Sequence, residues 1–553
     1  MSTSASDGAP VQQLRSWATV LALFVFATAW NLTKPYHIDD TAYLDIAQWI
    51  AGHPLHPMRG TLFWGDAPGS IQGVNQPHLY LYVMALWGSV FGWSEAAMHS
   101  LMALCALAAI AFMHRLARIV VPDRALLATA IVVASPVFVV GQNTMVDVPV
   151  LALWLLFYVI LLAPCESRER DRSRYLTAGL VCGAAILVKY TSLVLIPAIV
   201  LDGLLRRRPA ASYGVAAAAV IVSGWCAFNY WDYGGVHMLT RMAENGGWHV
   251  LDPSLWLLCL GATAPFSFPL AAASTNGPSR FARIATVLLW TALLAALALV
   301  VASSLGTIDR AASDAAFVVL FLTSGATLIA LAGRGLLRAR TSAPASNIAK
   351  PMLAYWALSA IVFVVVFAPF VAMRHVLLAL PPLVLLAVMA IPPQAGWRAG
   401  IVAVATTVVL TSIVASADRW YARIYRDEAK RLREMLPASA NVWTVGHWGW
   451  QWYARQNNMK ELVPGESQLA AGDFIVYAER VHNQPLPSPL AATDLHIDTI
   501  APGNWVQAFA GPHAGFYATT EFEQLPWAVR REPIEVFHVL RVEAAPVAPN
   551  PVQ

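Results

Sequence analysis

Long apolar segments separated by short polar ones run through the first three quarters of the chain. A helix needs roughly 20 mostly apolar residues to cross about 30 Å of hydrocarbon. The pattern therefore predicts a polytopic α-helical membrane protein with about thirteen spans. In chain order, the predicted spans are Ser16–Trp30, Ala96–Phe112, Ala125–Val140, Val146–Leu162, Tyr175–Val188, Ser192–Leu205, Tyr213–Tyr230, Pro253–Ala273, Ile284–Ser304, Ala315–Ala332, Met352–Val371, His375–Ile391 and Ile401–Ser416.

Composition agrees with this pattern. Of the 553 residues, 58% are hydrophobic and 12% are charged, and the mean hydropathy is +0.56. A soluble globular protein usually carries about 25% charged residues. So few charges over this length mean that apolar surface faces lipid as well as a protein core.

The basic residues set the predicted orientation, because Lys and Arg gather in cytoplasmic loops. With the N-terminus inside, the inner loops hold 18 Lys and Arg residues and the outer loops hold 6; the other 12 of the 36 follow Asp418. An odd number of spans then leaves the C-terminal segment outside. We expect residues 1–15 to be a disordered cytoplasmic N-terminus.

Two predicted outer segments are large enough to carry chemistry. The first is the loop from Thr33 to about Leu79, in which Asp39–Gly52 has the apolar spacing of an amphipathic helix at the membrane surface. The second, residues 417–553, regains charge and predicts a small α/β domain. It begins with an amphipathic helix, Asp418–Leu436. Its predicted strands are Asn441–Val445, Phe474–Ala478 and Pro533–Val539, and its Trp-rich stretch Trp443–Tyr453 favours domain core over a sugar-stacking face.

Three acidic residues on the outer side are candidates for catalysis. Asp39 and Asp40 stand in the first outer loop, and Asp147 begins the fourth span. Ionisable groups next to hydrocarbon are costly and often functional, and a carboxylate there can accept a proton from an acceptor hydroxyl. The alternative is that all three stabilise helix N-termini, with Asp39 or Asp40 as a cap. The two roles are compatible, since a cap fixes its side chain.

Two further segments are candidates for binding a phosphate. Gln76 and His78 lie in Asn75–Tyr80, which opens a helix whose free N–H groups attract phosphate; the alternative is a proline turn before an interfacial helix. Arg374 and His375 lie between two predicted spans. Arg374 either holds a lipid phosphate through bidentate hydrogen bonds or reaches up to lipid headgroups.

Three other residues complete the candidate substrate-binding set. Lys189, followed by Tyr190, interrupts the apolar region between the fifth and sixth spans, and Arg241 lies in the outer loop Trp231–Asp252. That loop also holds His237, Glu244 and His249, whose spacing matches no compact metal motif. We assign no metal and no cofactor to the chain, and a divalent cation stays open.

Five segments in a fixed order carry a family resemblance: IDDTAYLDIAQWI, NQPHLYLYVMALWGSVFGWSE, TMVDVP, LVKYTSLVLIPA and RHVLLALPPL. In that order they resemble the membrane-embedded GT-C glycosyltransferases of the family 39 type, which include protein O-mannosyltransferases and the aminoarabinose transferases that modify lipid A. The resemblance covers roughly residues 16–392. By this resemblance, residues 16–416 form a GT-C transmembrane domain, and residues 417–553 an outer domain like that of the aminoarabinose transferases.

The resemblance implies roles for individual residues. Asp39 matches the catalytic acidic residue of the first loop, with Asp40 in the slot usually held by Glu, and Asp147 matches the second acidic residue. Arg374 matches a late basic residue, with His375 in place of an aromatic one. Two positions depart from the family: Gln76-Pro77-His78 stands for Lys-Pro-Pro, which removes a phosphate-binding cation, and His99 stands for an arginine.

The resemblance also implies the function. We expect inverting transfer of a sugar from a polyprenyl-phosphate donor to a lipid, glycan or protein acceptor at the periplasmic face of a bacterial inner membrane, with no nucleic-acid partner. The alternatives are a polytopic lipid or glycan transporter and a catalytically silent glycolipid-binding assembly protein. A transporter is expected to carry ionisable or helix-breaking residues at mid-bilayer, often in repeated halves, whereas the charges here lie at span ends and no internal repeat is evident.

Overall fold

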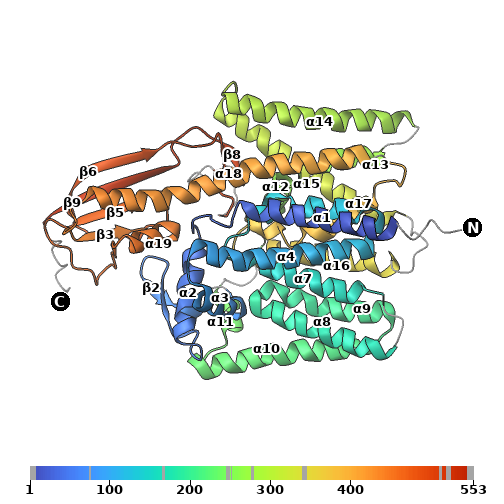
Figure 1. The fold of residues 1–553 in the computed structure, drawn as a ribbon, viewed down its shortest axis with the longest axis horizontal. Coiled ribbons are helices and arrows are strands. Elements are labelled where there is room, and N and C mark those ends of the chain that lie inside the picture. The colour runs from blue at the N-terminus through green and yellow to red at the C-terminus, as the bar shows by residue number, and fades with distance from the viewer. Residues whose placement is uncertain are drawn as a thin grey trace, which may run out of the picture.

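The protein is a long bundle of helices with a small mixed sheet at one end (Figure 1). The computed structural model describes residues 8–73, 76–164, 168–244, 250, 252–275, 279–338, 346–395, 397–509, 514–517 and 525–544. Of the residues named above, Asn75 and His249 lie outside these ranges, as do the residues after Ala544. The N-terminus lies at one end of the bundle, and the sheet lies at the other.

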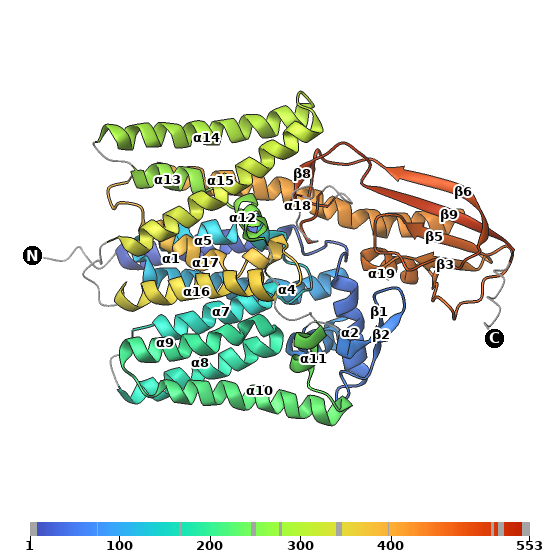
Figure 2. The same ribbon diagram turned by 180° about the vertical axis from the view of Figure 1, so that it is seen from behind.

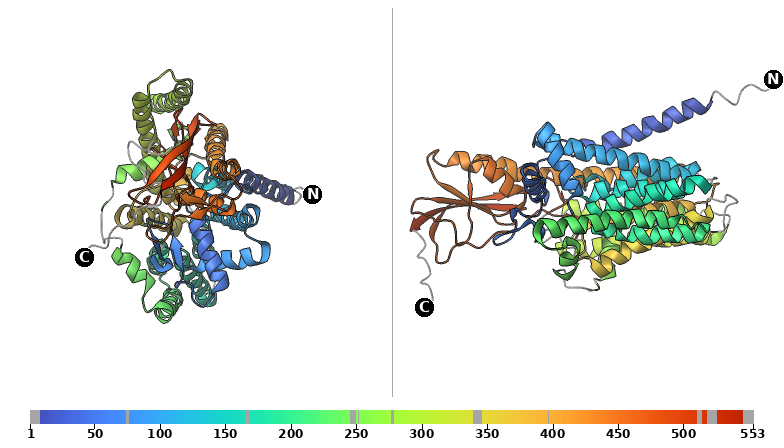
Figure 3. Two further views of the ribbon diagram at one scale, coloured as in Figure 1. Left: turned by 90° about the vertical axis from the view of Figure 1, so that its left-hand side faces the viewer. Right: turned by 90° about the horizontal axis from the view of Figure 1, so that it is seen from below.

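Helices make up almost all of the described bundle. Those that coincide with predicted spans are α1 (Gly8–Ala29), α4 (Glu95–Val120), α5 (Ala125–Val133), α6 (Pro136–Val139), α7 (Asp147–Leu162), α8 (Arg168–Val188), α9 (Leu195–Arg206), α10 (Ala211–Tyr233), α12 (Pro253–Ala262), α13 (Ser267–Thr275), α14 (Arg280–Leu305), α15 (Arg310–Leu337), α16 (Ser346–Phe367), α17 (Leu380–Met389) and α18 (Trp397–Met435). Helix α1 begins eight residues before the predicted span, and its N-terminal end leans away from the other helices (Figure 3, right).

Six of the described helices are long and apolar enough to cross a membrane, and a bent pair brings the number to seven. The chain is thus a multi-pass membrane protein by the length and composition of its helices, while the count of thirteen spans stays a prediction. The segment Pro253–Ala273 was wrongly predicted as one straight span, because α12 and α13 meet at 87°. A side chain at Gly261 on α12 would overlap the carbonyl of Phe321 on α15, so glycine allows these two helices to cross closely.

A second predicted span is also interrupted. The segment Ala125–Val140 divides into α5 and α6 at Ser135, with Pro136 as the first residue of α6. Proline has no N–H for the helix ladder and clashes with the preceding turn, but it suits the first position of a new helix. The chain therefore breaks here, close to the polar segment that contains Asn143 and Thr144.

The first outer loop covers the end of the bundle that faces the sheet. Helix α2 (Asp40–Gly52) confirms the predicted helix, and it crosses the ends of the long helices (Figure 1). A two-stranded hairpin, β1 (Thr61–Phe63) and β2 (Pro68–Ser70), follows it, and then α3 (Leu79–Phe91) returns to the bundle. Seen from behind, α2, β1, β2 and α11 (His237–Glu244) lie at this same end (Figure 2). Eight of the thirteen residues of α2 are buried, so this helix packs within the protein as well as along its surface.

The last long helix joins the two parts of the molecule. Helix α18 has 39 residues and runs from the bundle alongside the sheet (Figure 1). The predicted helix Asp418–Leu436 is confirmed as far as Met435, but it continues the last predicted span without a break. The change from apolar to charged residues at Asp418 marks where the helix meets a new environment, and its residues still favour helix.

The sheet has five strands in the order β4-β3-β5-β9-β6, with β3 parallel to β4 and β5 and with β9 antiparallel to β5 and β6. The strands are β3 (Val442–Val445), β4 (Lys460–Glu461), β5 (Phe474–Ala478), β6 (Ala491–Ile500) and β9 (Glu535–Ala544). A short pair, β7 (Val506–Gln507) and β8 (Ala528–Val529), lies beside α18. All three predicted strands coincide with strands, whereas β6 was missed, although polar Asp494, His496 and Asp498 alternate with apolar Leu495 and Ile497 in it. Helix α19 (Trp448–Gln456) buries Trp450, Trp452 and Tyr453, as the core interpretation predicted.

Charged contacts tie the C-terminal part to loops that were predicted to lie on one side. Arg455 pairs with Asp45 at 2.8 Å, Arg530 pairs with Asp314 at 2.7 Å, and the Tyr453 hydroxyl donates to Glu95 at 2.6 Å. Conversely, Arg124 and Arg338, which were both predicted to be inner, donate to carbonyls that follow α17. The predicted outer loops thus gather at one end of the bundle.

Candidate active site

Two ion pairs join four of the predicted site residues. Arg374 Nη1 lies 2.7 Å from Asp39 Oδ2, and Lys189 Nζ lies 2.7 Å from Asp147 Oδ1. Arg374 also attracts Asp147 at longer range, so the two pairs share one electrostatic environment. We call Asp39, Asp147, Lys189 and Arg374 the open cluster.

Each residue of the open cluster stands where a helix begins or ends. Asp39 occupies the N-cap position of α2, and Asp147 is the first residue of α7. Lys189 follows α8 directly, and Arg374 belongs to a short 3-10 helix, η4 (Met373–Val376), between α16 and α17. Helix ends leave backbone groups without intrahelical partners and bring the chain to a polar boundary. Four separate segments therefore supply side chains to one place.

Exposure distinguishes this cluster from the residues around it. The side chains of Asp39 and Arg374 are 27% and 17% exposed, whereas the neighbouring Asp40 is fully buried. A molecule that arrives from outside can therefore touch Asp39 and Arg374. The buried Tyr43, one turn along α2, lies near both of them. Burial, together with the nearby Asp147 and Asp39, raises the pKa of Tyr43, so its hydroxyl stays a hydrogen-bond donor.

Asp40 has a different environment from Asp39. Its Oδ1 accepts hydrogen bonds from the backbone N–H and the hydroxyl of Thr144, both at 2.8 Å, and its Oδ2 accepts from the backbone N–H of His37 at 3.1 Å. Neither aspartate caps α2 through its side chain, because Asp39 at the N-cap position makes no such bond and Asp40 turns to Thr144. The predicted alternative of side-chain capping is therefore wrong for this pair.

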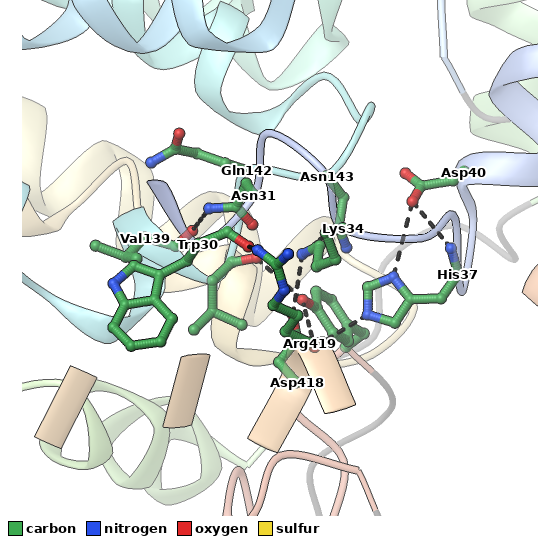
Figure 4. Close-up of polar contacts among 12 residues, drawn as sticks. Trp30, Asn31, Lys34, His37, Asp40, Val139, Gln142, Asn143, Asp418 and Arg419 are labelled. Atoms are coloured by element: carbon green, nitrogen blue, oxygen red, sulfur yellow. Dashed lines mark hydrogen bonds and ion pairs between the residues drawn. The ribbon is translucent and has the colours of Figure 1, made fainter. Parts of the chain in front are cut away.

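Asp40 belongs to a buried polar network that sequence reasoning missed. Asp418 on α18 accepts from Lys34 Nζ at 2.9 Å, from His37 Nε2 at 3.0 Å and from the Tyr517 hydroxyl at 3.0 Å, and Lys34 also donates to the Asn143 side chain. Figure 4 shows Lys34 and His37 converging on Asp418, with Asp40 beyond His37. We call this the Lys34–Asp418 network; its members are Lys34, His37, Asp40, Asn143, Thr144, Asp418 and Tyr517.

Around the network, further hydrogen bonds hold the ends of α1, α6 and α18 together. Arg419 donates to the Trp30 carbonyl at 3.1 Å, Asn31 donates to the Val139 carbonyl at 2.8 Å, and Gln142 donates to the Ala27 carbonyl at 3.0 Å (Figure 4). These bonds satisfy carbonyl groups at helix ends that would otherwise be buried without partners. The first outer loop is thus fixed at its start.

His37 is the titratable link of the network. Although burial opposes the charged form, the carboxylates of Asp418 and Asp40 raise the pKa of His37. Burial likewise disfavours ionised Asp40, but the hydrogen bond and the charge of His37 lower the pKa of that carboxyl. When His37 is protonated, its charge and that of Lys34 balance the two carboxylates.

The backbone between His37 and Asp39 is strained. Ile38 has φ +50° and is buried, with 4% of its surface exposed. The left-handed region costs an L-residue roughly 1–2 kcal/mol, and a β-branched side chain there is a genuine outlier. Such strain persists only where the surroundings hold it in place. The hydrogen bonds of His37 on one side and of Asp40 on the other provide that restraint.

One signal in the sequence pointed to this network. Lys34 and Asp418 carry opposite charges and stand just beyond the outer ends of the first and the last predicted span. A buried charge near hydrocarbon needs a partner, so their pairing was a reasonable expectation. In the sequence-based prediction, Lys34 served only as one of the outer basic residues, and Asp418 served only as the start of the outer domain's first helix.

The other predicted binding residues lie in a second group. The Tyr190 hydroxyl lies 2.8 Å from His237 Nδ1 and accepts from the Trp225 indole N–H at 3.1 Å, and the His78 ring lies 6.1 Å from that of His237. Burial, reinforced by His237, lowers the pKa of His78 to about 3, so His78 is neutral and supplies no cation for a phosphate. Its side chain does not cap α3.

The remaining candidates are dispersed around the same end of the bundle. Arg241 donates to the Gly73 carbonyl at 2.5 Å, which ties α11 to the first outer loop, and Gln76 is half-buried. His375 Nδ1 accepts from the Ala372 N–H at 3.2 Å. Burial, together with the positive charges of Arg374 and Lys189, lowers the pKa of His375, so the open cluster gains no third cation from it.

Two hollows on the surface lie away from both groups. One of about 660 Å³ is lined by Val200, Leu204, Arg207 and Ala211, at the end of α9 opposite Tyr190, and one of about 340 Å³ lies beside Arg338 and Pro392. We place more weight on the converging charges than on the size of a hollow, because both hollows are on the predicted inner side. Within the described ranges, no three His, Cys, Asp or Glu side chains form a group that would hold a metal ion.

A comparison with protein families finds a match for part of the chain. Residues 75–231 match the family described as dolichyl-phosphate-mannose-protein mannosyltransferase. This segment contains Asp147 and Lys189, whereas Asp39 and Arg374 lie on either side of it. The resemblance to the membrane-embedded GT-C glycosyltransferases, which the five sequence segments predicted, is thereby confirmed. No curated protein matches the chain.

Solved structures give looser similarities. ArnT from Cupriavidus metallidurans bound to undecaprenyl phosphate is 15% identical over 85% of this chain and 94% of that chain, with a TM-score of 0.44. The oligosaccharyltransferase of Archaeoglobus fulgidus is 14% identical over 83% and 65%, with a TM-score of 0.46. The S. cerevisiae protein O-mannosyltransferase complex bound to the sugar donor is 14% identical over 44% and 36%, with a TM-score of 0.31. At these TM-scores the similarities carry no residue-by-residue correspondence.

Proposed function

We propose that this chain is an integral membrane glycosyltransferase that transfers a sugar from a polyprenyl-phosphate-linked donor to a lipid, glycan or protein acceptor. The observation that carries the proposal is the open cluster, in which two carboxylates and two cations from four segments meet at one end of the bundle. The family match over residues 75–231 supports the same class of reaction.

In the proposed mechanism, Asp39 accepts the proton of the acceptor hydroxyl while the hydroxyl oxygen attacks the anomeric carbon. The bond between that carbon and the phosphate oxygen breaks, and polyprenyl phosphate leaves with the electron pair. A single displacement from the face opposite the leaving group inverts the anomeric configuration. Of the two adjacent aspartates, we assign the base to Asp39, because the hydrogen bonds of buried Asp40 already engage both of its oxygens.

Arg374 and Lys189 neutralise the leaving phosphate. Positive groups that are already aimed at the developing charge stabilise a transition state without reorganising. Arg374 uses one terminal nitrogen on Asp39, which leaves other N–H groups of the guanidinium for phosphate oxygens. Asp147 fixes Lys189 in position, and Tyr43 adds a neutral donor nearby.

We further propose that the cluster faces the non-cytoplasmic side, with the N-terminus in the cytoplasm and residues 417–553 outside a bacterial inner membrane. The excess of Lys and Arg in the predicted inner loops supports this orientation. The contacts of Asp45, Glu95 and Asp314 with the C-terminal part support one common side for the predicted outer loops. Reporter fusions before residue 16 and after residue 553 test this orientation: we expect a cytoplasmic signal from the first and a periplasmic signal from the second, and the reverse result would contradict it.

The central test uses Asp39→Asn in membranes supplied with radiolabelled polyprenyl-phosphate sugars. Loss of a general base lowers turnover by about 10²–10⁴-fold, while the lipid phosphate should still bind. The matched control is Asp45→Asn, the same change six residues further along the chain in α2, where the carboxylate pairs with Arg455. Full transfer by properly inserted Asp39→Asn would rule out the mechanism, and donor binding without turnover by the wild type would favour the silent binding protein.

A further inference from the structure

The strained residue Ile38 separates the two functional sides of the first outer loop. His37 and Asp40 face the Lys34–Asp418 network, whereas Asp39 faces Arg374. Consecutive residues point in these opposed directions because the backbone turns through the left-handed region at Ile38. The direction of Asp39 therefore depends on a conformation that an isoleucine disfavours.

Contacts on both sides of Ile38 hold that conformation. On one side, the Asp418 carboxylate on α18 accepts hydrogen bonds from His37 Nε2 at 3.0 Å and from Lys34 Nζ at 2.9 Å. On the other side, the Thr144 backbone N–H donates a hydrogen bond to Asp40 Oδ1 at 2.8 Å. Among the described residues, Asp418 bonds with Lys34, His37 and Tyr517, so it acts on Asp39 through the loop.

We propose that Asp418 is a positioning residue, which holds the strained segment Lys34–Asp40 so that Asp39 points at Arg374. The inference rests on the proposed function, because it assigns a purpose to the direction of Asp39. It also links the C-terminal part of the chain to the chemistry, since both Asp418 and Tyr517 lie C-terminal to the predicted last span, and α18 continues alongside the sheet. Asp418 touches no reacting atom itself.

The experiment exploits the difference between glycine and alanine at position 38. Ile38→Gly and Ile38→Ala both remove the buried side chain beyond Cβ, but only glycine adopts φ +50° without steric strain. With Asp418 present, the network imposes the conformation on either residue, and we expect the two variants to transfer sugar within about two-fold of each other. In the Asp418→Asn background, the Gly variant should be about five-fold or more faster than the Ala variant.

This ratio separates positioning from general stability. A purely structural role for Asp418 would give the same Gly-to-Ala ratio in both backgrounds, and that result would overturn the proposal. The expected effect of Asp418→Asn alone is a fall in kcat of about ten-fold or more, with little change in the KM for the donor. If Asp418→Asn does not insert, Tyr517→Phe removes one hydrogen bond to the same carboxylate, and the Gly-to-Ala ratio is measured in that background instead.

A second measurement does not depend on turnover. Hydrogen exchange of the peptides that cover residues 33–45 should be faster in Asp418→Asn than in the wild type. The control is Asp314→Asn, which breaks the pair between α15 and Arg530 and should leave these peptides unchanged. Unchanged exchange in Asp418→Asn overturns the positioning role. Faster exchange in a protein that transfers no sugar from any donor sinks the proposed function instead, so the two failures are distinguishable.

Discussion

Asp39 and Asp40 are neighbours in the chain, yet one belongs to an open pair of charges and the other to a closed network. Asp39 is 27% exposed and has one charged partner, Arg374, whereas Asp40 is fully buried and accepts three hydrogen bonds from His37 and Thr144. The open cluster has unused hydrogen-bonding capacity and an approach from outside. The closed network is buried and has no such approach. Reactivity and support are thus divided between adjacent carboxylates by their surroundings and not by their type.

The largest expected effect tests the open side. Arg374→Gln keeps a hydrogen-bond donor but removes the charge, and we expect transfer to fall by about 10²–10³-fold, as for the loss of one oxyanion donor. The resistance of the protein to thermal unfolding should change little, because partly exposed ion pairs contribute only about 0–1 kcal/mol. The measurement pairs single-turnover rates with thermal unfolding in the same detergent. A stability loss as large as the activity loss would mean that the open pair is structural.

The next effect tests the Lys34–Asp418 network, where the change should lose mainly stability and not mainly transfer activity. Lys34→Met leaves Asp418 buried without its ammonium partner, which costs about 3–5 kcal/mol in the free energy of unfolding. The double variant Lys34→Met, Asp418→Leu should recover part of that loss, because apolar residues often replace a buried ion pair at little cost. If the double variant is less stable than Lys34→Met, the pairing is not what holds this region together.

A smaller effect compares the network with a buried carboxylate that has mainly neutral partners. Glu535 on β9 accepts from the Tyr425 hydroxyl at 2.7 Å and from the Arg480 N–H at 2.9 Å, and burial raises its pKa to about 7. A raised pKa means that protonation favours the folded state, so this contribution is complete below about pH 4.5 and is lost as the pH rises through about 7. Glu535→Gln should flatten that dependence in unfolding curves between pH 4.5 and 7. An unchanged pH dependence of the unfolding free energy would mean that another group titrates in this range.

The smallest expected effect concerns the exposed contacts between the sheet and the bundle. Arg455→Gln breaks the pair with Asp45, and both side chains are partly exposed. We expect a change of less than about 1 kcal/mol in stability and less than two-fold in transfer. A strong loss of activity would show that this contact, and not only Asp418, couples the sheet to the open cluster.

The apolar pattern predicted where helices lie better than how they bend or join. Each predicted span overlaps at least one helix, because apolar residues over such lengths fold as helix in lipid. The 87° bend between α12 and α13 and the close crossing of α12 and α15 at Gly261 are tertiary features that the apolar pattern does not encode. The continuity of α18 was missed for a related reason, since the charges after Asp418 change its surroundings but not its helical conformation.

The candidate site divides in the same way. Asp39, Asp147, Lys189 and Arg374 were found because each stands at the end of an apolar segment and matches a family segment. The Lys34–Asp418 network was not found, because Lys34 and Asp418 are separated by 384 positions and meet only through the tertiary fold. The expectation that His78 supports a phosphate failed to anticipate its burial beside His237, which keeps the imidazole neutral.

Helix α18 has a mechanical consequence. Its 39 residues form a rod about 58 Å long at 1.5 Å per residue, with one end among the membrane helices and the other against the sheet. A rod of this kind has no swivel between its halves. Any bound molecule that tilts the sheet therefore tilts α18 as a whole, and the displacement reaches Asp418.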